Sequence, residues 1–346
     1  MINSALLEIT NKCNLKCIHC FYSDYISTYE MSIENIAYTI GKISALENLE
    51  YIGVTGGEPF LHSRFIDILK MFGDNFSKTR FLIITNGILL NDEILNLFSV
   101  YKNIAINISV DGSNRQINDM IRGNGTYDKL IESIEKVAAI DNNRLNLRMT
   151  IQKGNYKDVS DFFHLAKKYN VSANYLFVAE CGTAKLKWDE VGLSTSNKMY
   201  CYNELKKLYK SFNIDTPPPS DPEGCGLFDN IIINPKGNIY FCNILNSIFP
   251  DYFIGNIFKD SMELIENALD KNELTDELSL WQRRLLETEC GGCEVIKSCG
   301  QGCYGMYLAR KNRIGGSRTD NSLSDGNCVS KKYKYLIDQR DGSYAE

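Results

Sequence analysis

Short β-rich runs alternate with amphipathic stretches over the first half of this chain, and this pattern constrains the fold most strongly. Six runs predict strands, over 5–10, 51–55, 80–85, 103–110, 146–152 and 174–179. The stretches between them predict helices, over 32–46, 63–76, 92–99, 127–140 and 157–169. Strands separated by helices imply parallel βαβ units, and eight such units close a full barrel. Six units therefore predict an α/β fold, an incomplete (β/α)6 TIM-type barrel with its ligand site at the carboxyl ends of the strands.

The second half of the chain does not continue the alternation of strands and helices. A helix is expected over 196–212, and the run Pro217-Pro218-Pro219 then forms a stiff break. A hairpin is expected from strands at 231–233 and 239–242. We therefore expect a barrel over 1–185, a helical linker over 186–220 and a small cysteine-rich α+β domain over 221–346.

The composition of the chain limits which binding partners and which cellular location are expected. A formal net charge of −5 gives no pull toward nucleic acid or an anionic membrane, so neither is an expected partner. No signal peptide or long apolar segment is evident, which predicts a cytoplasmic protein. Twelve cysteines in such a chain favour metal ligation or redox chemistry over disulfides.

Three of these cysteines, Cys13, Cys17 and Cys20, form the pattern C-x-x-x-C-x-x-C directly after the first expected strand. Three thiolates can hold three irons of a 4Fe-4S cluster and leave the fourth iron open. A structural zinc site is the alternative, but it takes four ligands in two separated pairs, and this loop offers three. His19 could be a fourth ligand, although a side chain between two cluster cysteines would have to point away from the cluster.

A second motif, Thr55-Gly56-Gly57-Glu58-Pro59, follows the second strand. Glycines allow close approach of the backbone to a ligand, and the carboxylate can take an ammonium group. Together the two motifs resemble the radical S-adenosylmethionine (SAM) superfamily over roughly residues 5–180. The resemblance implies that SAM chelates the open iron and that its reductive cleavage gives a 5′-deoxyadenosyl radical, which abstracts a substrate hydrogen.

The resemblance also implies contacts to SAM at the strand ends. Gly56, Gly57 and Glu58 would meet the methionine amino group. Ser109 and Asp111 would meet the ribose and carboxylate, and Arg122 would pair with the carboxylate. Asn86 lies in a turn at the same rim, and His19 stands where the family commonly has an aromatic residue against the adenine. Turn chemistry and surface charge are the alternative explanation for Ser109, Asp111 and Arg122.

Seven further cysteines resemble the SPASM extension of radical enzymes that mature peptides. That resemblance implies two auxiliary 4Fe-4S clusters, one held by Cys290, Cys293, Cys299 and Cys328 and the other by Cys225, Cys242 and Cys303. Two structural zinc ions are the alternative. Cys181 and Cys201 have no assigned role, so either could supply a fourth ligand or a thiol hydrogen donor, or be a buried free cysteine that packs as a small hydrophobe.

SPASM relatives include sulfatase maturases and ribosomal-peptide maturases. A sulfatase maturase is expected to have an Asp that acts as a catalytic base just after the second auxiliary cysteine. This chain has Asn243 at that position, although Glu180 or Asp229 could serve as the base instead. The expected function is therefore a radical SAM oxidoreductase that installs a crosslink, a thioether or an epimer in a ribosomally made peptide. Expected partners are the peptide and an electron donor such as flavodoxin or ferredoxin. Any leader peptide is expected to bind the barrel surface, the SPASM surface or a separate protein. A radical enzyme for a small metabolite and a redox-inactive zinc-binding protein remain the alternatives.

Overall fold

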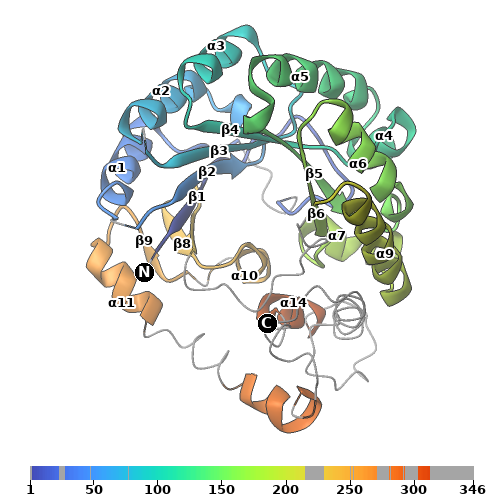
Figure 1. Ribbon diagram of the computed structural model, residues 1–346. Helices are drawn as coiled ribbons and strands as arrows, with labels where there is room; N and C mark the ends of the chain where they lie inside the picture. Colours follow the sequence, from blue (N-terminus) through green and yellow to red (C-terminus); the bar gives the residue numbers. More distant parts are fainter. Residues whose placement is uncertain are drawn as a thin grey trace.

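A nine-stranded sheet in the order β6-β5-β4-β3-β2-β1-β7-β8-β9 organises the computed structural model (Figure 1). The structure describes residues 2–22, 28–46, 48–76, 78–214, 230–249, 251, 253–270, 280, 282–290, 292 and 303–311. The strands are β1 (Ser4–Thr10), β2 (Tyr51–Gly56), β3 (Arg80–Thr85), β4 (Ile104–Ser109), β5 (Leu145–Ile151), β6 (Ser172–Phe177), β7 (Asn230–Ile233), β8 (Asn238–Tyr240) and β9 (Gly255–Asn256). β1 to β6 pair in parallel, each with its neighbour in sequence, which confirms the partial barrel.

Helices cover the outer face of these strands and form an arc around them (Figure 1). The covering helices are α1 (Ile33–Ile43), α2 (Phe65–Asn75), α3 (Asp92–Val100), α4 (Arg115–Arg122), α5 (Thr126–Asp141) and α6 (Val159–Lys168). α7 (Gly182–Leu186), α8 (Trp188–Val191) and the longer α9 (Thr195–Ser211) follow β6. All five expected barrel helices and the helix of the expected linker are present.

Among the six helices that cover the barrel strands, α4 is the one that sequence periodicity did not predict. Its eight residues are mostly polar, and only Ile117, Met120 and Ile121 are apolar, which is too short a pattern to predict a helix from periodicity. Local capping defines it instead: the side chain of Asn114 accepts a hydrogen bond from the backbone N–H of Ile117. Gly123 ends the helix at φ +118°, a conformation that other residues rarely adopt.

Alternation along each barrel strand divides the side chains between a core and a lumen. In β5, Leu147 and Met149 are fully buried in the core beneath the helices. Arg148 lies between them and therefore faces the opposite way, into the lumen. The same alternation puts Ile106 of β4 in the core and Asn107 in the lumen. The lumen is consequently far more polar than the core.

The sheet continues past the expected domain boundary. β7 pairs in parallel with β1, and β8 and β9 extend the sheet as antiparallel strands, which confirms the expected hairpin. Lys42 of α1 donates from Nζ to the carbonyl oxygens of Ile257 and Asp260 at 2.7 and 2.6 Å. One sheet therefore joins strands of the expected barrel to strands of the expected C-terminal domain. The division into a barrel, a linker over 186–220 and a separate C-terminal domain stays a prediction.

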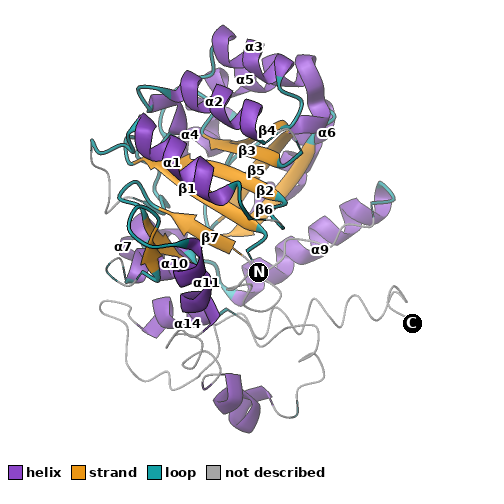
Figure 2. Cartoon of the chain, turned by 90° about the vertical axis from the view of Figure 1, so that its left-hand side faces the viewer, coloured by secondary structure: helices purple, strands orange, loops and turns teal. Residues whose placement is uncertain are grey.

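Beyond the hairpin lie α10 (Asn243–Ile248), α11 (Met262–Asp270), a π-helical turn (Leu286–Cys290) and α14 (Tyr304–Lys311), which appear below the barrel in Figure 2. α10 and α14 pack together. Among the described residues, no helix has the length and apolar character needed to cross a bilayer.

Candidate functional site

The cysteine loop, residues 11–22, leaves the carboxyl end of β1 and is tied to the ends of β2 and α4. The backbone N–H of Gly57 donates to the carbonyl oxygen of Thr10 at 2.8 Å, and that of Glu58 donates to Lys12 at 2.7 Å. Ile18 N–H donates to the carbonyl of Ile121 at the end of α4, at 3.1 Å. Backbone hydrogen bonds therefore hold the loop that carries the three cysteines against β2 and α4.

The two glycines of the second motif are required by this loop. A Cβ on Gly56, which has φ +125°, would lie 2.2 Å from the carbonyl oxygen of Thr10. A Cβ on Gly57 would lie 2.1 Å from the carbonyl oxygen of Lys12. Both separations are far below van der Waals contact, so only glycine lets the end of β2 approach the cysteine loop this closely.

Cys13, Cys17 and Cys20 are each half-buried on this loop. Burial raises the pKa of Cys13 and Cys17, and the nearby guanidinium of Arg122 opposes that rise in both. Within the described residues, no three His, Cys, Asp or Glu side chains already converge as ligands of a single metal ion. An iron–sulfur cluster does not require such convergence, because each cysteine binds a different iron. The three thiols beside a buried cation fit an anionic cluster of this kind.

Glu58 is fully buried at the start of the short 3-10 helix Pro59–Leu61. Its carboxylate accepts hydrogen bonds from Oγ1 of Thr85 at 2.7 Å, from the backbone N–H of Asn86 at 2.8 Å and from that of Phe60 at 3.2 Å. Burial raises the pKa of Glu58 to about 7, although these hydrogen bonds favour the ionised form. In this structure Glu58 thus joins the ends of β2 and β3.

Asn86 continues this connection toward the cysteines. Its Nδ2 donates to Oδ1 of Asn14 in the cysteine loop at 2.8 Å, and its Oδ1 accepts from the backbone N–H of Ile88 at 3.0 Å. Asn86 therefore holds the loop and the rim of the barrel together, and its expected contact with the cofactor stays a prediction.

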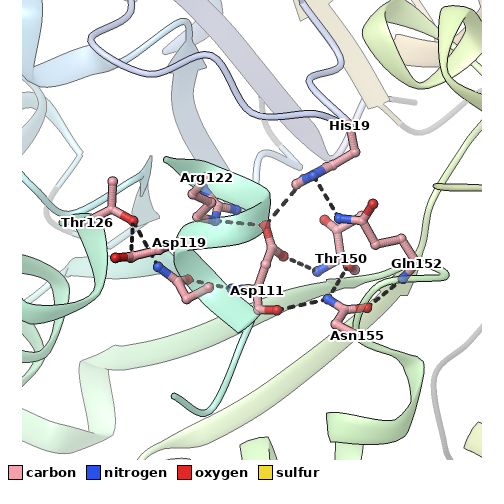
Figure 3. A network of polar contacts seen from close by, with 9 residues as sticks. His19, Asp111, Asp119, Arg122, Thr126, Thr150, Gln152 and Asn155 are labelled. Atoms are coloured by element: carbon pink, nitrogen blue, oxygen red, sulfur yellow. Dashed lines mark hydrogen bonds and ion pairs between the residues drawn. The ribbon is translucent and has the colours of Figure 1, made fainter. Parts of the chain in front are cut away.

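Asp111 is the centre of a second polar network (Figure 3). Its Oδ2 lies 2.7 Å from Nε of Arg122 and 3.4 Å from Nε2 of His19. Its Oδ1 accepts from the backbone N–H of Thr150 at 2.8 Å. Burial disfavours the charge on Arg122, but Asp111 beside it raises the pKa of that guanidinium overall. Burial lowers the pKa of His19, which favours a neutral imidazole.

Three residues that sequence reasoning missed support this network. Nδ2 of Asn155 donates to the carbonyl oxygens of Asp111 and Thr150 at 2.9 and 3.0 Å, and Asn118 accepts from the backbone N–H of Asp111 at 3.1 Å. Nε2 of Gln152 lies 3.2 Å from Nδ1 of His19. Gln152 and Asn155 could have been recognised as site residues because they are polar and follow the carboxyl end of β5, where a barrel of this kind has its ligand site.

Ser109 is the last residue of β4 and is half-buried. Its Cα pairs in register with Arg148 of β5. The structure thus brings Cys13, Cys17, Cys20, His19, Gly56, Gly57, Glu58, Asn86, Ser109, Asp111 and Arg122 to one edge of the sheet. Their contacts to SAM stay a prediction.

The remaining cysteines are distributed unevenly. Cys242 directly precedes α10, Cys303 directly precedes α14 and Cys290 ends the π-helical turn. The other expected cluster ligands, Cys225, Cys293, Cys299 and Cys328, lie outside the described residues, as does Asp229.

Cys181 and Cys201 occupy different environments. Burial raises the pKa of Cys181, and Cys242 and Cys20 lie close enough to raise it further. Cys201 belongs to the hydrophobic core and donates to the carbonyl oxygen of Tyr156 at 3.4 Å. Burial raises the pKa of Cys201 to about 12, and no described cysteine contributes to that rise. The structure therefore places Cys181, and not Cys201, next to expected cluster ligands.

Two of the positions considered for a catalytic base, Glu180 and Asn243, lie among the described residues. Glu180 is buried next to Cys181. Asn243 is the first residue of α10, and its Oδ1 is buried without a hydrogen-bond partner in the described part of the chain. An amide in this position cannot take a proton at neutral pH.

Comparison with known proteins identifies this architecture. Residues 7–171 match the model of the Radical SAM superfamily. The mycofactocin maturase MftC of Mycolicibacterium smegmatis is 23% identical over 309 residues, which cover 86% of this chain and 76% of MftC. The antilisterial bacteriocin subtilosin biosynthesis protein AlbA of Bacillus subtilis is 27% identical over 87% of this chain and 66% of AlbA. The solved structure of native anSMEcpe with bound AdoMet and Cp18Cys peptide superposes with a TM-score of 0.76 over 98% of this chain and 97% of that one, at 18% identity.

Proposed function

Since residues 7–171 place this chain in the radical SAM superfamily, we propose that it is a maturase that crosslinks, thioether-links or epimerises a ribosomally made peptide. The observation that carries this proposal is the extent of the similarity to MftC and AlbA, which covers 86% and 87% of the chain and so continues past the barrel. One of these relatives is named as a maturase and the other as a bacteriocin biosynthesis protein. The shared fold of anSMEcpe, which was solved with a peptide, is consistent with a peptide substrate.

The cysteine loop would hold the 4Fe-4S cluster through Cys13, Cys17 and Cys20. When bound, this cluster and SAM supply the radical that removes a hydrogen atom from the substrate. The chain's own part is to position them: Gly56 and Gly57 let the loop close onto the barrel rim, and the buried guanidinium of Arg122 provides positive charge beside the thiolates. His19, neutral because it is buried, would present its ring toward the adenine.

Two auxiliary clusters complete the proposed cofactor set. Cys290, Cys293, Cys299 and Cys328 would hold one of them, and Cys225, Cys242 and Cys303 would give three ligands to the other. Cys181 would be the fourth ligand of the second cluster, because it lies next to Cys242. The backbone N–H of Gly182 also donates to Oγ of Ser247 in α10, at 3.2 Å, which fixes Cys181 against the helix that Cys242 precedes.

This ligand assignment is tested by counting iron and sulfide in Cys181→Ala and in its matched control Cys201→Ala. We expect Cys181→Ala alone to change the absorbance and electron paramagnetic resonance of the auxiliary clusters. Identical iron contents and spectra for the two variants would remove Cys181 from the ligand set.

The peptide reaction is tested with anaerobically purified, cluster-filled protein, SAM, a reductant and peptides encoded beside the gene. A flavodoxin or ferredoxin would be the physiological donor, and a chemical reductant replaces it in the assay. We expect deoxyadenosine and either loss of two hydrogens from the peptide, which indicates a crosslink or thioether, or unchanged mass with deuterium uptake, which indicates an epimer. A colourless, iron-free preparation, or deoxyadenosine formation with every peptide left unchanged, would contradict the proposal.

A further inference from the structure

The barrel lumen contains a polar cavity that is lined by none of the residues expected to contact the cofactors. Its volume is about 400 Å³. It is lined by Tyr51, Arg80, Leu82, Asn107, Asn146, Arg148, Asn174, Tyr175 and Leu176. Two arginines thus line it, and no acidic side chain does so within the described residues. A hollow with this charge balance favours an anionic ligand.

Arg148 is the central feature of this cavity. The two buried arginines of the described residues each pair with a carboxylate, Arg122 with Asp111 and Arg144 with Asp141, both at 2.7 Å. Arg148 has no such partner in the described part of the chain. Burial lowers its pKa, and the titratable groups that oppose this shift are the phenols of Tyr22 and Tyr51. A half-buried guanidinium without a carboxylate partner is costly, so this side chain is prepared for an anion.

Three asparagine amides line the same cavity as this guanidinium. Asn174 pairs in Cα register with Arg148 across β5 and β6, and Asn146 pairs with Asn107 across β4 and β5. Among the described residues these three side chains make no hydrogen bond, and Oδ1 of Asn107 is buried without a donor. Amides that can both donate and accept, next to a guanidinium fork, match a carboxylate attached to a peptide group.

Glu8 does not fill this site from within the protein. It faces the lumen from β1, but its hydrogen-bond partner is Tyr22, and it does not contribute to the electrostatics of Arg148. Tyr22 itself follows Cys20 by two residues, so the same phenol lies near both Arg148 and the cysteine loop. The cavity is therefore connected through one side chain to the expected cofactor site.

We propose that the lumen binds a carboxylate of the peptide substrate through Arg148, with Asn107, Asn146 and Asn174 as its polar neighbours. This inference rests on the proposed peptide reaction and names the chemical group that the substrate must carry. Arg148 lies three residues before Ile151 at the end of β5, about 10 Å along the strand. The carboxylate therefore belongs within about three residues of the modified position in an extended peptide.

Three small probes distinguish the two sources of such a carboxylate. N-acetylglutamate α-amide carries it on the side chain, N-acetylglutamine carries it at the C-terminus, and N-acetylglutamine α-amide carries none. Binding to the cluster-filled protein is measured by saturation-transfer NMR and competition. We expect at least one acidic probe to bind at least tenfold more tightly than the neutral probe, and the tighter acidic probe identifies the source.

Variants then assign the binding to this site. Arg148→Gln should weaken acidic-probe binding at least tenfold, and Arg115→Gln, at an exposed arginine of α4, should not. Asn174→Asp, which is nearly isosteric, should have the same effect as Arg148→Gln because its carboxylate occupies the guanidinium, and it keeps the test decisive should Arg148→Gln fail to fold. Iron content confirms folding in each case.

Equal binding of the neutral and acidic probes, or unchanged binding in both Arg148→Gln and Asn174→Asp, would overturn the inference. The peptide reaction is measured independently on wild-type protein. A modified peptide with Arg148-independent probe binding refutes only the carboxylate site, whereas an unmodified peptide refutes the proposed function.

Discussion

Replacing Glu8 with glutamine should remove a loss of stability that develops as the pH rises through neutrality. Glu8 is 4% exposed, and its Oε1 makes no hydrogen bond within the described residues. Burial raises the pKa of this carboxyl from 4.5 to about 7, against the opposing effect of a hydrogen bond with Tyr22. The folded protein therefore keeps the proton over a pH range in which the unfolded chain has already released it.

The sign and the size of this change in the free energy of unfolding follow from the linkage between proton binding and folding. A carboxyl whose pKa is raised by folding contributes its full stability below pH 4.5 and loses it as the pH rises through about 7. Each pKa unit corresponds to about 1.4 kcal/mol, so the total loss is about 3 kcal/mol. Glutamine keeps the shape of the side chain but cannot ionise, so the variant should not show this loss.

The assay is urea denaturation of both proteins between pH 4.5 and 8, followed by circular dichroism under anaerobic conditions. The free energy of unfolding of Glu8→Gln minus that of the wild type should increase by about 3 kcal/mol across this range. Glu263→Gln, at an exposed position on α11, serves as a control and should give a flat difference. A flat difference for Glu8→Gln as well would refute the reasoning that burial governs this carboxyl.

Three further substitutions have defined outcomes. Gly57→Ala puts a Cβ 2.1 Å from a carbonyl oxygen of the cysteine loop and should lose most of its iron, whereas Gly41→Ala, with open space around it, should keep wild-type iron content by colorimetric assay. Arg144→Met removes a guanidinium whose Nη1 donates to three backbone carbonyl oxygens, and chemical denaturation should show a loss of about 2–4 kcal/mol. Asp111→Asn leaves Arg122 buried without its carboxylate, so it should be destabilised by about 3 kcal/mol or more in the same assay, and a wild-type midpoint would contradict that pairing.

The sequence by itself determined the elements of the barrel and the position of the cysteine loop. Each expected strand from 5–10 to 174–179 overlaps an observed one, because strand and helix formation depend on local apolar periodicity. Cys13, Cys17 and Cys20 follow β1 directly, so the parallel topology alone places them at the carboxyl edge. α4 could not be found this way, since its eight residues include only three apolar ones and its bounds are set by the Asn114 cap and by Gly123.

Tertiary structure decided which of the recognised residues contact one another. Asp111 pairs with Arg122, Gly57 packs on the cysteine loop, and Cys181 lies near Cys242, all through contacts between segments that the spacing of residues does not specify. β7 joins the sheet beside β1 in the same way, although more than 200 residues separate them. Burial and charge pairing depend on which distant segments pack together, and a single sequence records the residues of such pairs without recording the pairing.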